Sequence, residues 1–383
     1  NRLRVWQLMA ESHRLATAAR VARKPDGKIK VAFFVQRRAL WPNHASIYEA
    51  MKADPSFEVS VIVTPKRGGY SEILNMQEYR HLKGFLEDKG IPFFPGYDEE
   101  SRCWVNPLKF GLPDVVFIPQ PFTKDINLFY GSEFWKSFAK IAYVPYGITL
   151  ANLPGQQNRL PFFYDCWRIF VESEFHWDLF QSYNPGVQDR LVVTGHPKLD
   201  LYLKPPNTRG LWKMPTASKR IIWAPHFTVA DNRTPHTFSN FFAYYELFLD
   251  CARHNPEIEW VMRPHPELFT FMVTTGQKTQ RDADEYRRRF NALPNGQVYE
   301  GGDIFEMFKE SDALILDSIC FLAEYLPTGK PICFLESQRR QKLNPVGEAL
   351  LATYYKAWNA EDIKRFVREV VLADCDPLKA QRM

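Results

Sequence analysis

The sequence lacks several features that would place it in a common class. It has no run of about 18 or more uninterrupted apolar residues, and its start shows no secretory signal pattern, so it predicts neither a membrane span nor export. It contains no P-loop and no G-x-G-x-x-G pattern, which disfavours a kinase-like ATPase and an ordinary dehydrogenase. Short internal repeats and low-complexity segments are missing as well. These absences indicate a globular protein of the cytoplasm, or one peripheral at the inner face of the cell membrane.

Closely spaced cysteine pairs are also missing. The spacing typical of a zinc site or a redox dithiol does not occur, so we expect reduced, mostly buried thiols and no metal site. The six cysteines are Cys103, Cys166, Cys251, Cys320, Cys333 and Cys375.

The chain is too long for one hydrophobic core. With 383 residues, of which 45% are hydrophobic, it exceeds the usual size of a single domain, so two domains with a cleft between them are expected. The formal charge of +5 is modest for this length, and we expect no nucleic-acid partner.

The opening segment, residues 1–27, is locally basic and is expected to form a helix. Glu11 is its only acidic residue before Asp26, and leucine and alanine residues recur at a spacing that places them on one helical face. Such a helix either contacts an anionic membrane surface or packs on the protein with its charges in solvent. Both interpretations stay open. The basic residues are Arg2, Arg4, Arg14, Arg20, Arg23 and Lys24.

Short apolar runs alternate with helical patterns along the rest of the chain. This alternation is typical of parallel sheets covered by helices, so the predicted fold class is α/β, with two doubly wound Rossmann-like domains facing each other across a cleft. The expected strands are 31–35, 57–63, 114–118, 141–144, 168–171, 191–193, 220–223, 258–262 and 313–316.

A proline-rich polar stretch, Lys204–Gly210, has no apolar period and suits a linker. We therefore predict an acceptor-side domain over 28–204 and a domain that binds a nucleotide donor over 205–358. The last segment, 359–383, is expected to form a helix that packs back toward the first domain.

Polar clusters follow three of the expected strands in the second half. In an open parallel sheet, the carboxyl ends of neighbouring strands meet at one edge, where ligands collect. The clusters should therefore form one site. They are Trp223-Ala224-Pro225-His226, Arg263-Pro264-His265-Pro266, and Asp317-Ser318 with Glu324.

His226 and His265 stand beside prolines at equivalent strand ends, which favours turns at the sheet edge. Imidazoles there can donate hydrogen bonds to phosphate oxygens, and the guanidinium group of Arg263 can make a bidentate contact with the same phosphate. The alternative is that both histidines bond local backbone carbonyls.

Other residues are assigned to the same site. Ser318 is predicted to cap a helix over 319–326 and to help Asp317 bind the anionic donor, and Glu324 to accept hydrogen bonds from ribose hydroxyls. Lys198, after the strand 191–193, would add positive charge, although that loop is also a possible hinge. A purely local role stays open for each.

The first domain offers two candidates for chemistry on an acceptor hydroxyl. His44 follows the first strand, and its ordinary pKa of about 6.5 suits a general base. Tyr146 lies in a tight turn after 141–144, where its hydroxyl is a good hydrogen-bond donor but a poor base.

Together, these residues resemble the CDP-glycerol glycerophosphotransferase family, the teichoic-acid and capsule polymer transferases, over roughly residues 30–336. The matching parts are Asn43 with Ile47-Tyr48-Glu49, Gly195-x-Pro197-Lys198-x-Asp200, Trp223-Ala224-Pro225, Arg263-Pro264-His265-Pro266, Ser311-Asp312-Ala313 leading to Asp317, and Lys330-Pro331.

The resemblance implies a GT-B fold, a CDP- or UDP-linked donor bound mainly by the second domain with His265 near its phosphates, and no cofactor. The implied activity is transfer of glycerol phosphate or a sugar to a hydroxyl of a cell-surface glycan or lipid-linked acceptor.

The sequence departs from the family pattern at two places that bear on this activity. Tyr146 stands where the family has the histidine of Trp-His-Gly, and Asp317-Ser318-Ile319-Cys320 replaces Asp-Tyr-Ser-Ser. Two alternatives therefore stay open, a nucleotide-sugar-dependent glycosyltransferase and a catalytically inactive nucleotide- or glycan-binding domain of a capsule-assembly protein.

Overall fold

A computed structural model describes residues 2–22, 27–67, 74–152, 159–206, 210–229, 238–301, 304–319, 321–338 and 340–383. The chain forms two compact units. The first contains residues 1–149 and 153–201, and the second contains Leu150–Asn152 together with Tyr202–Met383. The predicted linker, 204–210, lies partly outside the described residues.

The first unit is built on a seven-stranded sheet whose strands all run parallel, in the order β3-β2-β1-β6-β7-β8-β9. Its order reverses between β1 and β6, which makes this pair the topological switch point. The strands are β1 Ile29–Val35, β2 Phe57–Val63, β3 Phe94–Pro95, β6 Val115–Phe117, β7 Lys140–Tyr143, β8 Arg168–Val171 and β9 Leu191–Val193. A separate hairpin joins β4 Tyr97–Asp98 to β5 Cys103–Trp104.

Strand β1 shows why this sheet is covered on both faces. Val31, Phe33 and Val35 pack into one core with α2 and α3, whereas Ala32 and Phe34 pack into another with α4, α5 and α6. A strand that is apolar at nearly every position is stable only between two covering layers. The helices are α1 Arg2–Ala22, α2 Ala45–Ala53, α3 Met76–Asp88, α4 Ser132–Trp135, α5 Phe162–Asp165 and α6 Glu174–Tyr183, with short 3-10 turns at Arg38–Asn43, Pro107–Phe110, Thr123–Asp125, Leu128–Tyr130, Gln188–Arg190 and Pro197–Leu203.

Helix α1 packs its apolar side on the first unit. Leu8, Leu15 and Ala16 join the core on the α4 side, and the Asn106 amide donates to the Ser12 hydroxyl at 2.9 Å. Arg14 and Arg20 are exposed. These contacts match the packing-helix interpretation. Over the described residues, no helix has the length and apolar content needed to cross a bilayer.

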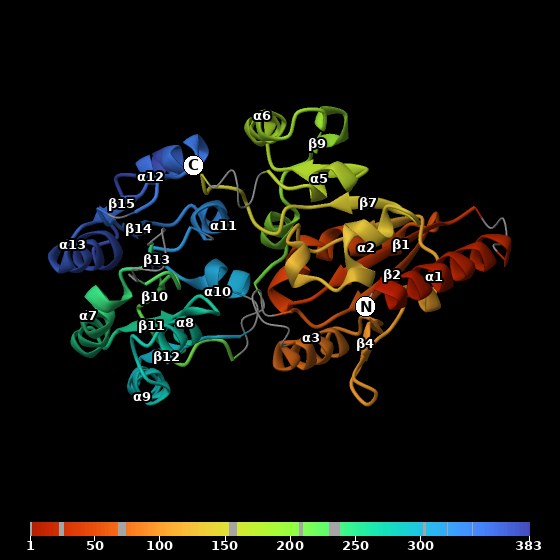
Figure 1. Cartoon of the computed structure of the whole chain (residues 1–383). Coiled ribbons are helices and arrows are strands. Elements are labelled where there is room, and N and C mark those ends of the chain that lie inside the picture. The colour runs from red at the N-terminus through yellow and green to blue at the C-terminus, as the bar shows by residue number, and fades with distance from the viewer. Residues whose placement is uncertain are drawn as a thin grey trace. The chain divides into compact units, whose positions relative to one another are not determined.

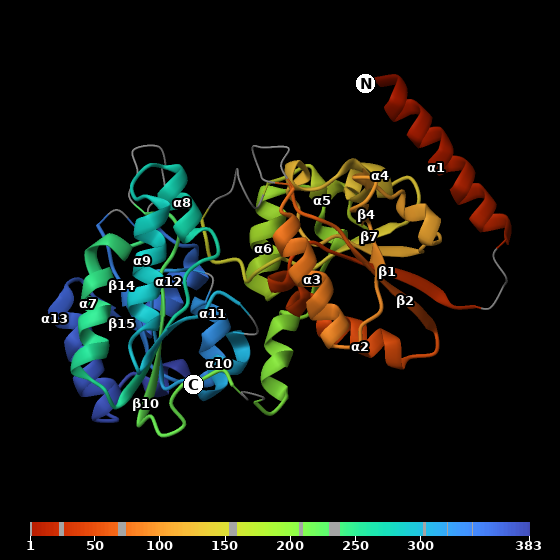
Figure 2. The same cartoon turned by 90° about the horizontal axis from the view of Figure 1, so that it is seen from below.

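The second unit contains a six-stranded parallel sheet in the order β12-β11-β10-β13-β14-β15, with its switch point between β10 and β13. Helices α7 and α13 lie along one face, and α10 and α11 along the other (Figures 1 and 2). The strands are β10 Lys219–Ala224, β11 Ile258–Met262, β12 Gly296–Val298, β13 Ala313–Leu316, β14 Ile332–Leu335 and β15 Tyr355–Ala357. The helices are α7 Phe241–His254, α8 Leu268–Thr274, α9 Gln280–Asn291, α10 Ile304–Glu310, α11 Leu322–Tyr325, α12 Pro345–Ala352, α13 Ala360–Arg365 and α14 Lys379–Arg382, with a 3-10 turn at Leu326–Thr328 and a π-helix at Phe366–Leu372.

The C-terminal segment packs into the core of the second unit. Ile363, Phe366, Val367 and Val371 belong to the hydrophobic core of the second unit, together with α7. The expectation that this segment packs toward the first domain stays a prediction. The apolar stripe of a helix shows that the helix packs, but it does not identify the surface on which it packs.

Candidate functional site

Three parallel strands of the second unit end side by side. Trp223 pairs with Met262, and Ala224 pairs with Leu316, so the clusters after β10, β11 and β13 emerge at one edge of the sheet. The site predicted from the sequence therefore forms a single region, and it lies at the β10/β13 switch point.

His226 and His265 are neighbours at this edge. Their ring centroids are 5.2 Å apart, and the backbone N–H of His265 donates to the Pro225 carbonyl at 3.0 Å. Phe227 packs on both rings, with centroid distances of 4.6 Å to His226 and 4.5 Å to His265. His226 is buried, whereas His265 is partly exposed.

The backbone fixes where the ring proton of each histidine sits. Nδ1 of His226 accepts the N–H of Thr228 at 3.2 Å, and Nδ1 of His265 accepts the N–H of Glu267 at 3.1 Å. A ring nitrogen that accepts carries no proton, so in each neutral imidazole the proton is on Nε2, which becomes a donor. Burial lowers the pKa of His226 to about 3, so this ring is neutral near pH 7.

Asp317 holds the edge together and does not face solvent. One carboxylate oxygen accepts the backbone N–H of His226 at 2.6 Å, and the other accepts the backbone N–H of Asn240. The residue is 0% exposed, and burial raises the pKa of its carboxyl group to about 7. Its predicted role as a direct ligand of the activated donor is corrected by this geometry, because both oxygens are directed at main-chain groups.

Ser318 lies at the same edge but does not cap a helix. Helix α11 begins at Leu322, after Phe321, and has only four residues, so the helix predicted over 319–326 is shorter and starts later. The argument that a helix N-terminus at Ser318 binds an anion was therefore wrong. The Ser318 side chain is buried beside Asp317.

Arg263 and Glu324 make contacts with the main chain. The Arg263 guanidinium donates to the carbonyls of Tyr299 at 3.2 Å and Pro264 at 3.3 Å, which ties the end of β11 to the segment after β12. Glu324 is buried in α11, and its carbonyl accepts the hydroxyl of Tyr202 at 2.6 Å. The phosphate role of Arg263 and the ribose role of Glu324 stay predictions.

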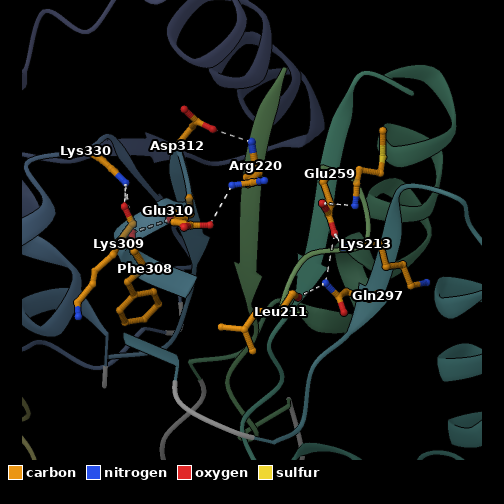
Figure 3. Close-up of polar contacts among 12 residues, drawn as sticks. Leu211, Lys213, Arg220, Glu259, Gln297, Phe308, Lys309, Glu310, Asp312 and Lys330 are labelled. Atoms are coloured by element: carbon orange, nitrogen blue, oxygen red, sulfur yellow. Dashed lines mark hydrogen bonds and ion pairs between the residues drawn. The ribbon is translucent and has the colours of Figure 1, made fainter. Parts of the chain in front are cut away.

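The opposite, amino-terminal edge of this sheet carries two other parts of the family resemblance (Figure 3). Lys330 Nζ donates to the carbonyls of Phe308 and Lys309, where α10 ends, and Asp312 accepts the backbone N–H of Arg220 at 2.7 Å. The Ser311-Asp312-Ala313 and Lys330-Pro331 motifs therefore build the fold of the second unit.

The same edge contains a buried carboxylate, Glu259 (Figure 3). It accepts the backbone N–H groups of Lys213 at 2.5 Å and Met214 at 2.9 Å, and it is 0% exposed. It therefore holds the segment before β10 against β11.

In the first unit, His44 is enclosed by aromatic rings. Its ring lies 5.6 Å from that of Phe33 and 5.8 Å from that of Phe117, and it is 1% exposed. Burial lowers its pKa to about 4, and among the described residues no partner reaches either ring nitrogen. His44 therefore lacks the access that a base for an acceptor hydroxyl needs, which corrects the prediction.

Tyr146 occupies a turn that other side chains hold in place. His196 Nε2 donates to the Pro145 carbonyl at 2.9 Å, Glu172 accepts the N–H of Thr149 at 2.8 Å, and the His176 ring bonds the Thr149 carbonyl at 2.9 Å. The Tyr146 ring packs edge-on against Phe122.

Lys198 is buried two residues after His196, whose Nδ1 accepts its backbone N–H at 3.3 Å. The donor role of Lys198 and the catalytic role of Tyr146 stay predictions.

Sequence reasoning missed several residues at the two switch points. Thr228 bonds the His226 ring, and the backbone N–H of Asn240 donates to Asp317. In the first unit, the Gln120 amide donates to Gln36 at 2.7 Å, which joins the ends of β6 and β1. Their position in the sequence could have identified two of these residues, because Gln36 directly follows β1 and Thr228 lies two residues after His226. Within the described ranges, no group of three or more His, Cys, Asp or Glu side chains is arranged to hold a metal ion.

Comparisons with known proteins identify the fold. No protein-family model matches the chain, and no curated protein matches it. Among solved structures, the chain is similar to the S. aureus MnaA–UDP complex, with a TM-score of 0.61 and 15% identity over 92% of this chain and 90% of that one. A UDP-GlcNAc 2-epimerase from Neisseria meningitidis bound to UDP-GlcNAc gives a TM-score of 0.58 and 14% identity, over 93% of this chain and 94% of that one.

The wall teichoic acid polymerase TagF gives a TM-score of 0.57 and 13% identity over 96% of this chain and 87% of that one. At such identities the similarity shows the fold alone. The predicted fold class is confirmed: the chain is α/β, with two Rossmann-like domains of the GT-B type.

Proposed function

We propose that this protein is a transferase that takes glycerol phosphate or a sugar from a nucleotide-activated donor and passes it to a hydroxyl of a cell-surface glycan. One observation carries the proposal: His226 and His265 present adjacent imidazoles, with centroids 5.2 Å apart, at the switch point of the second sheet. Switch points of doubly wound sheets are where nucleotides bind, and Nε2–H groups are suitable donors for phosphate oxygens. Similar folds solved with UDP, UDP-GlcNAc and CDPG support the assignment.

In the proposed phosphotransfer, the acceptor oxygen forms a bond to the distal phosphorus of a CDP-linked donor. The bond between that phosphorus and the bridging oxygen breaks, CMP leaves with the electron pair, and the hydroxyl proton is released to solvent. Negative charge on the phosphoryl oxygens and the leaving phosphate is stabilised by the Nε2–H groups of His226 and His265 and by Ser318. Positioning and charge stabilisation are the contributions of the protein.

A nucleotide screen by thermal unfolding tests the binding part of the proposal. A ligand present at about 100 times its Kd and bound only by the folded protein adds about 2.7 kcal/mol of stability. We expect cytidine or uridine diphosphates to raise the melting temperature more than adenosine or guanosine diphosphates. A protein that binds no pyrimidine nucleotide contradicts the proposal.

The product distinguishes the transfer reactions. Release of CMP from CDP-glycerol in the presence of acceptor identifies phosphotransfer, whereas release of a nucleoside diphosphate from a nucleotide sugar identifies glycosyl transfer. Nucleotide binding without turnover identifies the inactive binding domain, which the presence of Tyr146 in place of the family histidine favours.

A UDP-sugar epimerase is a second candidate. It is favoured by the observation that several similar solved structures are UDP-GlcNAc 2-epimerases. Formation of an epimeric sugar that is released from, or still linked to, UDP without any acceptor would identify this activity.

A further inference from the structure

Asp317 stands out among the residues of the candidate site because its carboxyl group is fully enclosed and directed at the backbone. Its two oxygens accept the N–H groups of His226 and Asn240, which belong to the end of β10 and the start of α7. Placing a carboxylate in the interior is costly unless its oxygens are hydrogen-bonded. One side chain thus fixes two separate main-chain segments at the switch point.

A closed set of hydrogen bonds connects these two segments to the His226 ring. The Phe238 N–H donates to the Thr228 hydroxyl at 3.0 Å, and this hydroxyl contacts His226 Nδ1 at 2.8 Å. Because the hydroxyl oxygen already accepts from Phe238, its own hydrogen is available for Nδ1. Phe238 is two residues before Asn240, whose backbone N–H donates to Asp317, so the hydrogen bonds link the His226 ring back to Asp317.

These hydrogen bonds fix both the orientation and the tautomer of the His226 imidazole, and they do so through its backbone and Nδ1, not through Nε2. His226 is held at its backbone by Asp317 and at Nδ1 by Thr228, through the N–H at 3.2 Å and the hydroxyl. His265 is held in a similar way, by Pro225 at its backbone and by Glu267 at Nδ1. The Nε2–H group of His226 is the polar end of this preoriented imidazole.

We propose that Asp317 is a positioning residue of the donor site: it contacts no ligand and aims the Nε2–H group of His226 at the donor phosphates by fixing the backbone at His226 and at Asn240. The inference rests on the proposed function for the identity of the ligand. It assigns Asp317 a role through His226, whereas the sequence suggested direct contact with the donor.

The chain offers a matched control for the test. Glu259 is also a fully buried carboxylate that accepts two backbone N–H groups, but it lies at the opposite edge of the same sheet. Asp317→Asn and Glu259→Gln make the same chemical change, because in each an amide NH₂ replaces one oxygen and opposes a backbone N–H. Both variants should lose stability, and only one should affect the site.

The experiment measures CDP and UDP affinity by calorimetry and records the histidine ring nitrogens by NMR in protein labelled with ¹⁵N-histidine. Variants His226→Gln and His265→Gln assign the two rings. We expect both rings to carry the proton on Nε2 in the wild type. Asp317→Asn should shift the His226 ring signals and weaken nucleotide binding about tenfold or more. Glu259→Gln should change neither, although its melting temperature falls.

The proposal is overturned if Asp317→Asn leaves the His226 signals and the affinity unchanged, or if both variants weaken binding equally. If the wild type binds neither CDP nor UDP, the proposed function fails, and the NMR comparison decides the positioning role by itself. Shifted His226 signals in Asp317→Asn alone would then uphold it, and unshifted signals would reject it.

Discussion

Individual histidines at strand ends share one local arrangement in both units. In His196, His226 and His265, Nδ1 accepts the backbone N–H two residues later, so the proton is on Nε2. His196 uses this proton to bond the Pro145 carbonyl, which gives it a structural role. A histidine in this local geometry thus has either a structural role or a role in a candidate site, and the group that its Nε2–H contacts decides which.

His265 allows a direct test at this scale, because it is partly exposed and its substitution should not disturb the core. We expect His265→Ala to weaken CDP or UDP binding about tenfold, through loss of a hydrogen bond to a charged group. The free energy of unfolding should change by less than about 1 kcal/mol. Calorimetric titration and urea unfolding measure the two quantities.

An unchanged affinity in His265→Ala would remove this residue from the candidate site. The matched control is His254→Ala, an exposed histidine at the end of α7 whose ring contacts the Asp250 carbonyl. This control should leave nucleotide binding unchanged.

Whole elements place these residues. Each sheet reverses its order next to its first strand, at β1/β6 and at β10/β13, and at both points polar groups from the two strand ends meet. Gln36 meets Gln120 in the first unit, and the His226 backbone meets Asp317 in the second. Strand order therefore selects which of the strand-end residues come together.

The C-terminal helical segment is a structural element of the second unit. Phe366 is 3% exposed within the core that contains α7, so Phe366→Ala should lower the free energy of unfolding of this unit by about 3–5 kcal/mol. Urea unfolding followed by circular dichroism checks this value. Leu203→Ala is the control, because Leu203 is 85% exposed and its truncation should cost less than about 0.5 kcal/mol. Equal effects of the two changes would contradict this packing.

At the scale of the whole molecule, buried titratable groups predict that the two units respond differently to acid. In the first unit, burial lowers the pKa of His44 to about 4, and burial, with a smaller contribution from Lys198, lowers the pKa of His196 to about 3. In the second, burial lowers the pKa of His226 to about 3 but raises the pKa of Asp317 to about 7.

The signs follow from proton binding. A histidine with a lowered pKa takes up its proton only on unfolding. Its contribution to the stability of the folded unit is therefore present above pH 6.5 and is lost as the pH falls toward the pKa of the folded state. Asp317 has a raised pKa and acts in the opposite direction, with stability present below about pH 4 and lost as the pH rises through about 7. The two histidines of the first unit should therefore lower its free energy of unfolding by about 2.7 kcal/mol for each pH unit below pH 6. In the second unit, the opposite contributions of His226 and Asp317 to the free energy of unfolding cancel.

Limited proteolysis at pH 7 and pH 5, with the cleavage sites mapped, measures this difference. We expect cleavage in the first unit to increase at pH 5 more than cleavage in the second. His44→Leu should reduce the increase, because it removes one of the two titrating groups. Equal sensitivity of both units, or no effect of His44→Leu, would contradict the assignment.

Much of the fold could be predicted from local pattern. The expected strands 57–63 and 258–262 coincide with β2 and β11, because long runs with one period carry strong signals. Strands β3, β12, β14 and β15 were not predicted, and three of them, β3, β12 and β15, have only two or three residues each. So few residues do not define a period, and neighbouring strands determine whether they pair.

The sequence by itself determined that apolar strands end in polar clusters, and parallel pairing alone then required His226, His265 and Asp317 to share one edge. Only the tertiary structure decided what each side chain faces. It turned Asp317 toward two backbone N–H groups, closed aromatic rings around His44 and placed the C-terminal helix in the second core. The physical reason is that local pattern determines which residues are buried or emerge at an edge, whereas contact partners come from segments far apart in the chain.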